Sequence, residues 1–150
     1  MPTKRPRGGS SPLADRVNAG QSVSRPRLLF IDDDAAIGGV VSRMLRDTFD
    51  VTVHTSARAA YARIAAGEPY DAIVCDLMMP DMTGMDLHQR LSETDPAGAD
   101  RIVFVTGGTF TPSAEDFLRY VKNPRLEKPF DRAELLAAVA VILSRSSGRR

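Results

Sequence analysis

The sequence predicts an α/β fold, in which a parallel β-sheet lies between layers of helices. Five predicted strands, most of them short apolar runs, alternate with segments whose apolar residues recur at helical spacing. The apolar runs lack alternation with polar residues, which is typical of strands buried on both faces of a parallel sheet. The 150 residues, of which 43% are hydrophobic and 26% charged, suit one globular domain.

The first half of this pattern begins with a predicted strand at residues 28–31. A helix follows, although Gly38 and Gly39 each cost about 1 kcal/mol within it. The apolar face of this helix consists of Ile37, Val40, Val41, Met44 and Leu45. A short strand covers residues 51–53, and Ser56 is placed to cap the next helix. The buried stripe of that helix consists of Ala57, Ala60, Tyr61, Ile64 and Ala65.

The second half adds three strands, at residues 72–75, 102–105 and 125–127. A helix at about residues 84–91 separates the first two of these strands. Pro112 suits the first turn of the helix that precedes the last strand. Asp131 and Glu134 form a capping-box pattern, which predicts that the final helix begins there.

The distribution of charge divides the chain into three parts, although its formal net charge is only +1. Residues 1–26 are rich in Pro, Gly, Ser and Arg without periodicity, which predicts a disordered basic arm. Residues 27–144 form the predicted folded domain, and residues 145–150 a second disordered basic tail. Neither basic segment contains an aromatic residue that could stack on bases, so solvated arms are favoured over nucleic-acid binding.

Cysteine content and hydropathy narrow the class of protein. Cys75 is the only cysteine, so the chain can form no internal disulfide and offers no cluster of thiols to zinc. No apolar run approaches the ~20 residues of a membrane helix, and the N-terminus lacks the apolar stretch of a signal peptide. We therefore expect a cytoplasmic protein that does not insert into a membrane.

Polar residues follow the predicted strands at their carboxyl ends. Asp32 and Asp33 come after the first strand, Asp76 after the third, Thr106 after the fourth and Lys128 after the fifth. In an open parallel sheet these ends form one crevice, so the five side chains are expected to lie together. Carboxylates in such proximity repel one another and need a proton or a cation, and Mg²⁺ suits a site of oxygen ligands.

A carboxylate, a metal ion, a hydroxyl group and an ammonium group together predict phosphoryl transfer. Asp76 is the expected nucleophile, which attacks phosphorus and forms an acyl phosphate. Mg²⁺ and Lys128 are expected to neutralise charge on the transferring oxygens, and the Thr106 hydroxyl to donate a hydrogen bond. Taken singly, Lys128 would be a surface lysine and Thr106 a strand-end hydroxyl. Their coincidence at successive strand ends favours a site.

Four nearby residues have a simpler structural interpretation. Asp34 is expected to cap the helix that follows it rather than to bind metal. Cys75 is expected to be a small buried hydrophobe that points away from the site. His54 and His88 lack a partner pattern, so no chemistry is assigned to them.

Four stretches resemble the receiver domain of bacterial two-component signalling. They are Leu28-Leu-Phe-Ile-Asp-Asp-Asp34, Asp76-Leu-Met-Met-Pro-Asp-Met-Thr-Gly84, Val103-Phe-Val-Thr-Gly107 and Lys128-Pro-Phe130. The resemblance covers residues 27–144 and is closest to receivers of hybrid histidine kinases and to stand-alone single-domain response regulators. It implies a flavodoxin-like, doubly wound fold, in which a five-stranded parallel sheet of order 2-1-3-4-5 carries helices on both faces.

The resemblance also implies a metal site. Asp32 and Asp33 correspond to the family's acidic pair, which binds Mg²⁺ together with the phosphoacceptor Asp76. The backbone carbonyl of Met78 is expected to complete the protein's share of the metal shell. Thr106 then corresponds to the switch hydroxyl.

Lys128 corresponds to the lysine that senses the phosphoryl group, and the Lys128–Pro129 peptide bond is expected to be cis. The implied partner is a histidine kinase or a histidine phosphotransfer protein, which donates the phosphoryl group from a phosphohistidine. Self-phosphorylation and slow autodephosphorylation at Asp76 are the only activities expected, so the protein is not classed as an enzyme. The resemblance also allows a phosphorylation-dependent homodimer.

One position departs from the family pattern. Three residues before the lysine, where many receivers have Tyr or Phe, this chain has Arg125. An aromatic rotamer change is therefore excluded, and Arg125 is expected to face solvent because burying an unpaired guanidinium is costly. No output domain is expected after residue 144.

Two other functions remain as alternatives. The first is a receiver-fold scaffold that binds proteins without phosphorylation. The second is a small aspartyl-nucleophile phosphatase, which also places Asp, Thr and Lys at strand ends. That family places Thr or Val after an Asp-x-Asp-x motif, whereas Ala36 follows here, and the chain lacks an acidic motif after Lys128.

Overall fold

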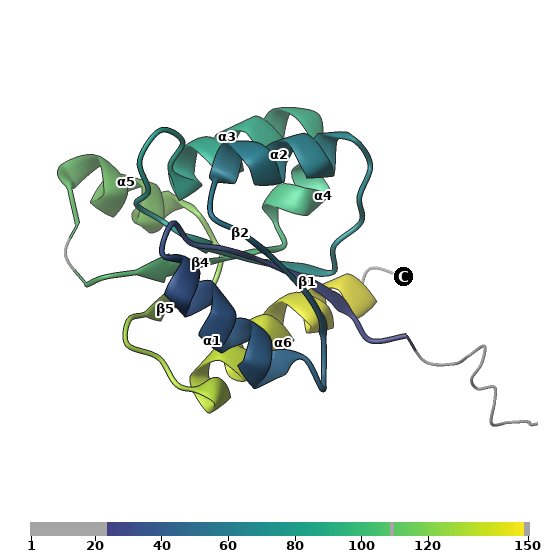
Figure 1. The fold of residues 1–150 in the computed structure, drawn as a ribbon. Helices are drawn as coiled ribbons and strands as arrows, with labels where there is room; N and C mark the ends of the chain where they lie inside the picture. Colours follow the sequence, from purple (N-terminus) through teal and green to yellow (C-terminus); the bar gives the residue numbers. More distant parts are fainter. Residues whose placement is uncertain (1–23, 109, 149–150) are drawn as a thin grey trace, which may run out of the picture.

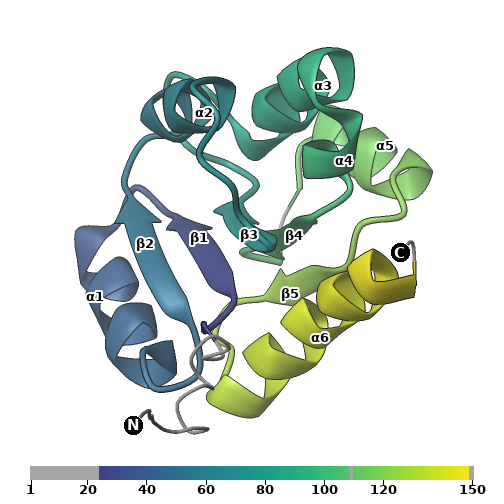
Figure 2. The same ribbon diagram turned by 90° about the vertical axis from the view of Figure 1, so that its right-hand side faces the viewer.

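The computed structural model describes residues 24–108 and 110–148. Five parallel strands form one sheet in the order β2-β1-β3-β4-β5, as the sequence predicted (Figures 1 and 2). The strands are β1 (Arg27–Ile31), β2 (Asp50–His54), β3 (Ala72–Asp76), β4 (Ile102–Thr106) and β5 (Arg125–Glu127). The order changes direction between β1 and β3, so the chain leaves these two neighbouring strands towards opposite sides.

Helices cover both faces of the sheet. They are α1 (Ala35–Leu45), α2 (Ala57–Ala65), α3 (Gly84–Thr94), α4 (Pro96–Ala99), α5 (Pro112–Tyr120) and α6 (Arg132–Gly148). Helices α1 and α6 lie on one face, and α2, α3, α4 and α5 on the other (Figure 2). None of the helices in the described ranges is both long enough and apolar enough to cross a bilayer.

The sheet separates two apolar cores. Leu29 and Ile31 of β1 pack on the face of α2 and α3, whereas Leu28 and Phe30 pack on the face of α1 and α6. Successive residues of a strand point to opposite faces, and helices cover both faces, so all four side chains are fully buried. The prediction that the apolar runs are buried on both sides is therefore confirmed for β1, β3 and β4, whereas the edge strands β2 and β5 are partly exposed.

The local signals that begin the helices act as expected. Asp34 caps α1 by accepting a hydrogen bond from the Ala36 N–H, and Ser56 caps α2. At the start of α6, the Asp131 and Glu134 side chains each accept a hydrogen bond from the other's backbone N–H. The Lys128–Pro129 bond is cis, as predicted.

Four features differ from the sequence prediction. Ala65, assigned to the buried stripe of α2, is exposed at the end of that helix. Val40, assigned to the buried face of α1, is 46% exposed, because Gly38 and Val41 turn towards the sheet instead. The short helix α4 was not predicted. Helix α6 continues through Gly148, so the disordered tail predicted from residue 145 is wrong for residues 145–148. An established helix adds residues at low cost, and the Arg145 side chain donates a hydrogen bond to the Lys122 carbonyl. Most of the predicted N-terminal arm lies outside the described residues.

Close packing of α1 on β2 explains the position of Gly38. A Cβ atom at residue 38 would lie 2.5 Å from Cγ1 of Val53, whereas one at the neighbouring Gly39 would meet only Arg43, at 3.7 Å. We expect Gly38→Ala to lower the free energy of unfolding by about 1 kcal/mol or more, because overpacking outweighs the gain in helix propensity. Gly39→Ala, as the matched control, should raise it by about 0.5–1 kcal/mol. Urea denaturation measures both, and equal effects of the two substitutions would contradict this packing argument.

Candidate functional site

The carboxyl ends of the strands bring the predicted site residues to one edge of the sheet. Ile31 pairs with Cys75, so the residues that follow them, Asp32 and Asp76, become neighbours across β1 and β3. Asp76 in turn pairs with Val105, which places Thr106 one residue beyond it on β4. The register of the parallel sheet therefore assembles side chains that are far apart in the sequence.

Lys128 connects the two buried carboxylates. Its Nζ lies 2.9 Å from Asp32 Oδ2 and 3.0 Å from Asp76 Oδ2, and the side chain is 28% exposed. The backbone N–H of Lys128 donates to the Thr106 carbonyl at 2.8 Å, which continues the β4–β5 pairing and holds the lysine at the sheet edge. Three elements, β1, β3 and the segment after β5, thus meet through one ammonium group.

Three carboxylates form a cluster at this edge. Asp32, Asp33 and Asp76 each offer an oxygen within 4.8 Å of the others. Asp32 and Asp76 are buried, at 1% and 8% exposure, whereas Asp33 is exposed. The cluster therefore opens to solvent on the side of Asp33.

The hydrogen bonding of this cluster fits a divalent cation. Asp32 Oδ1 accepts from the Asp34 N–H at 2.9 Å, and the fully buried Asp32 Oδ2 has the Lys128 ammonium as its partner at 2.9 Å. One ammonium group thus faces three clustered carboxylates, and carboxylates so close together need further positive charge. Oxygen ligands of this kind, with one open side for water, are those that Mg²⁺ prefers.

The electrostatics of Asp76 reflect two opposing influences. Burial raises the pKa of its carboxyl above the ordinary value, while the hydrogen bond from Lys128 acts to lower it. For Lys128, burial acts to lower the pKa, but the hydrogen bonds to Asp32 and Asp76 outweigh it and the pKa is raised. The lysine is therefore held firmly in its charged form beside two carboxylates.

The loop after β3 and the end of β4 complete the surroundings of Asp76. The Met78 N–H donates to Asp76 Oδ1 at 3.2 Å, so this loop begins by turning over the carboxylate. A Cβ atom at Gly84 would lie 2.7 Å from the Asp76 carbonyl oxygen, so only glycine permits the start of α3 to approach so closely. Thr106, 5% exposed, ends β4 at the same edge.

The residues that were assigned structural roles lie as expected. Cys75 is fully buried, and burial raises the pKa of its thiol. His88 packs between Phe104 and Phe117, with ring centroids 5.9 Å and 5.3 Å away. Arg125 is exposed on β5, as predicted.

One ion pair beside the site was not predicted from the sequence. Arg58 of α2 binds Asp81, which lies on the loop after β3. The two residues are 23 positions apart, and neither stands at a strand end. No periodic pattern links them, so only the loop conformation reveals the contact.

Comparison with known proteins gives a consistent result. A family model described as the response regulator receiver domain matches residues 28–140. The chain is 39% identical over 121 residues to the transcriptional regulatory protein FixJ of Azorhizobium caulinodans. This alignment covers 78% of this chain and 54% of FixJ. It is 33% identical over 129 residues to the DNA-binding transcriptional regulator NtrC of Rhizobium meliloti, covering 81% of this chain and 25% of NtrC. The chain thus spans about half the length of FixJ and a quarter of NtrC.

Solved structures show the same relationship. The signal receiver domain of a putative LuxO repressor protein from Vibrio parahaemolyticus has a TM-score of 0.72 at 25% identity and covers 83% of this chain and 95% of its own. The chemotaxis protein CheY4 of Vibrio cholerae has a TM-score of 0.69 at 27% identity and covers 80% of this chain and 100% of its own.

The fold, the site and the comparisons lead to one conclusion. The parallel sheet has the order 2-1-3-4-5, and the acidic pocket of Asp32, Asp33 and Asp76 is typical of a phosphoacceptor site. Receivers of this kind act in two-component signalling, where phosphorylation of an aspartate carries the signal. This chain belongs to the response regulator receiver domain family.

Proposed function

We propose that Asp76 is the residue that accepts the phosphoryl group, from a phosphohistidine of a histidine kinase or a histidine phosphotransfer protein. The observation that carries this assignment is the position of Asp76, which is buried, paired with Lys128 and clustered with Asp32 and Asp33. A carboxylate in this setting is confined in one orientation, with a cation beside it and an opening on one side.

The residues of this chain divide the chemistry among them. One carboxylate oxygen of Asp76 attacks phosphorus, the phosphorus–nitrogen bond of the phosphohistidine breaks, and the imidazole leaves with the bonding electron pair. No general base is required, because the nucleophile is a carboxylate and the Lys128 ammonium beside it favours the ionised form. The Lys128 ammonium compensates negative charge on the phosphoryl oxygens, and the Thr106 hydroxyl donates a hydrogen bond to one of them.

Asp32, Asp33, Asp76 and the backbone carbonyl of Met78 are the proposed Mg²⁺ ligands. The three carboxylate oxygens that lie within 4.8 Å of one another and the open side at Asp33 support this set. A bound Mg²⁺ supplies Lewis-acid stabilisation of charge on the phosphoryl oxygens. Beyond phosphorylation and slow hydrolysis of its own acyl phosphate, no turnover of a separate substrate is proposed.

Asp33→Ala tests the metal assignment. Asp33 is exposed, and Lys128 forms its ion pairs with Asp32 and Asp76. The substitution of Asp33 therefore removes a proposed ligand without removing a partner of Lys128. We expect labelling by acetyl phosphate to require at least about tenfold more Mg²⁺ than in the wild type. Intact-mass spectrometry across a Mg²⁺ series measures this. Asp47→Ala, which removes an exposed carboxylate outside the cluster, is the control. Unchanged Mg²⁺ dependence in Asp33→Ala would show that the ligand set is wrong.

The readout of phosphorylation is expected to depend on Thr106 and not on Arg125. Thr106 is buried at the site, whereas Arg125 is exposed on β5 and cannot replace a buried aromatic switch. In the presence of beryllofluoride and Mg²⁺, Thr106→Val, which keeps the volume but removes the hydroxyl, should abolish the ligand-induced NMR shifts of α5. Arg125→Ala should leave most of these shifts in place. If both variants abolish the ligand-induced NMR shifts of α5 equally, Arg125 takes part in the conformational switch.

A further inference from the structure

The loop that carries Met78 is held from inside by apolar contacts. It connects β3 to α3 over residues 77–83. Leu77, Met79 and Met82 are buried in the core, at 1%, 7% and 2% exposure, and the Gly84 N–H donates to the Leu77 carbonyl at 2.9 Å. These contacts fix the base and the inward side chains of the loop, whereas Pro80 and Asp81, which form its outer turn, are exposed.

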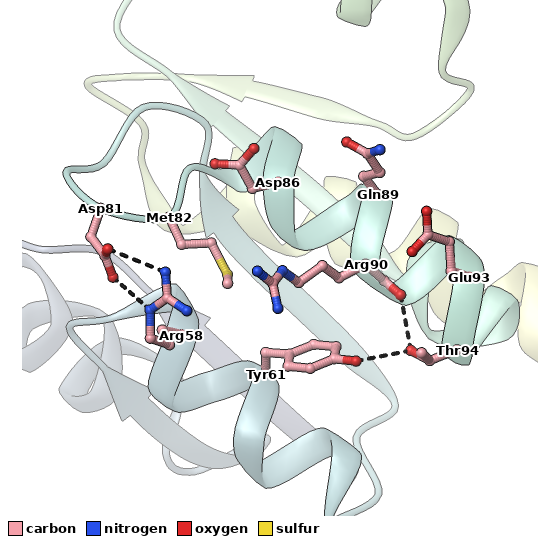
Figure 3. A pocket seen from close by; sticks show the side chains of 9 residues that line it. All are labelled: Arg58, Tyr61, Asp81, Met82, Asp86, Gln89, Arg90, Glu93 and Thr94. Carbon is pink, nitrogen blue, oxygen red and sulfur yellow. Dashed lines mark hydrogen bonds and ion pairs between the residues drawn. The ribbon is translucent and has the colours of Figure 1, made fainter.

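The outer turn of the loop is held by Arg58. The guanidinium donates from Nε to Asp81 Oδ2 at 2.8 Å and from Nη2 to Asp81 Oδ1 at 3.2 Å, a bidentate arrangement that fixes direction as well as distance (Figure 3). The same hydrogen bond holds the pKa of Asp81 below its ordinary value. The pair stands at one end of a pocket between α2 and α3, whose walls also include Tyr61 and Arg90 (Figure 3).

The backbone at Asp81 adopts a conformation that needs such support. Its φ angle is 70°, and it is the only residue other than glycine with a positive φ within residues 24–108 and 110–148. Aspartate tolerates this region better than most residues, but the conformation persists only where the surroundings favour it. Asp81 lies three residues after Met78 in the same loop.

We propose that Arg58 is a positioning residue for the metal-binding loop, and that its bidentate contact with Asp81 holds the Met78 carbonyl in the orientation that Mg²⁺ requires. This inference rests on the proposed function. It links α2, which contributes no residue to the acidic cluster, to the affinity of the phosphoacceptor site. The ion pair is exposed, at 56% and 63% for the two side chains, so it adds little to global stability and acts through local geometry.

A Mg²⁺ titration followed by two-dimensional amide NMR tests the proposal. The chain contains no tryptophan, so NMR replaces tryptophan fluorescence as the probe. Arg58→Ala is expected to weaken Mg²⁺ binding by about threefold to tenfold, because an exposed ion pair should count for less than the outer-shell partners whose loss costs about tenfold to a hundredfold. The melting temperature of the metal-free protein should change by less than about 2 °C.

Arg63→Ala is the matched control. Arg63 lies on the same helix, is 54% exposed and forms an ion pair with Glu68, away from the loop. Its substitution removes the same charge and should leave Mg²⁺ affinity unchanged. Arg58→Lys keeps the charge but cannot form the bidentate contact, so it should rescue only part of the affinity.

A second readout needs no metal. In EDTA, amide hydrogen exchange at residues 78–82 should be faster in Arg58→Ala than in the wild type, and unchanged in Arg63→Ala. Asp81→Asn, which suits the positive φ but loses the charge, should reproduce the Arg58→Ala effects, and the double variant should add nothing further.

The outcomes separate the two levels of the argument. If the wild-type protein shows no saturable Mg²⁺ binding, the proposed function fails and the inference fails with it. If the wild type binds Mg²⁺ and Arg58→Ala binds it with equal affinity, the positioning role alone is overturned. An equal loss of affinity in Arg58→Ala and Arg63→Ala would also overturn it, since net charge alone would then explain the effect.

Discussion

Asp76→Asn is expected to abolish phosphorylation of this protein completely. Incubation of the wild type with acetyl phosphate and Mg²⁺ should add a single phosphoryl group, whereas the variant should add none. The amide has the shape of the carboxylate, but its oxygen is uncharged and a poor nucleophile. Because Asp76 Oδ1 accepts the Met78 N–H and Oδ2 lies next to Lys128, the oxygen of the introduced amide can still accept one of these contacts, and the fold is retained.

Intact-mass spectrometry at near-neutral pH measures the phosphoryl adduct. Loss of this adduct in hydroxylamine identifies it as an acyl phosphate. Asp71→Asn is a suitable control, because this carboxylate lies at the opposite end of β3 and accepts a hydrogen bond from the Arg27 N–H. It should be labelled like the wild type. An adduct of undiminished yield on Asp76→Asn would place the phosphoacceptor elsewhere in the chain.

Lys128→Ala is expected to have the largest effect on stability, and only in the absence of metal. The substitution leaves two buried carboxylates, Asp32 and Asp76, without their cation. Removing one partner of a buried ion pair costs about 3–5 kcal/mol, and the partial exposure of the lysine reduces this to about 2–3 kcal/mol. Thermal unfolding in EDTA should show this loss, and Mg²⁺ should restore more stability to the variant than to the wild type.

The pH dependence of Lys128→Ala follows from the same electrostatics. Burial already raises the pKa of Asp76 in the folded state, and the loss of the lysine removes the main opposing influence. A carboxyl whose pKa is higher in the folded than in the unfolded state destabilises the fold, and this penalty is fully present at pH values above the folded-state pKa. The penalty shrinks as the pH falls through the folded-state pKa and is lost below the unfolded-state pKa, so in EDTA the stability difference from the wild type should shrink on acidification.

Lys122→Ala is the control for this series, because Lys122 is exposed and its side chain is not part of the acidic cluster. It should unfold like the wild type at every pH and Mg²⁺ concentration. In our interpretation, Lys128 compensates the charge of Asp32 and Asp76 in the metal-free protein. If Lys128→Ala instead loses most of its Mg²⁺ affinity and gains no stability from the metal, this role is contradicted.

The sequence determined the layers of the fold and the membership of the site. Apolar runs such as residues 28–31 are buried on both faces wherever they occur in a parallel sheet, and residues that follow such strands gather at one edge. Asp34 and Ser56 determine helix starts through contacts within three residues, which local sequence can specify. Strand burial and helix capping are therefore readable without knowledge of the rest of the chain.

Tertiary structure decided the individual contacts. The sequence placed Lys128 and Asp76 at one edge of the sheet, but only the packed chain shows that the ammonium group bridges Asp76 and Asp32. Arg58 contacts Asp81 in a turn of positive φ that no sequence pattern predicted. Val40 lies outside the core because Gly38, without a side chain, lets α1 approach β2 on a different face. Periodicity assigns a side chain to a face only within a regular element, whereas contacts across loops and between elements depend on strand register, turn conformation and local volume, which are properties of the packed chain.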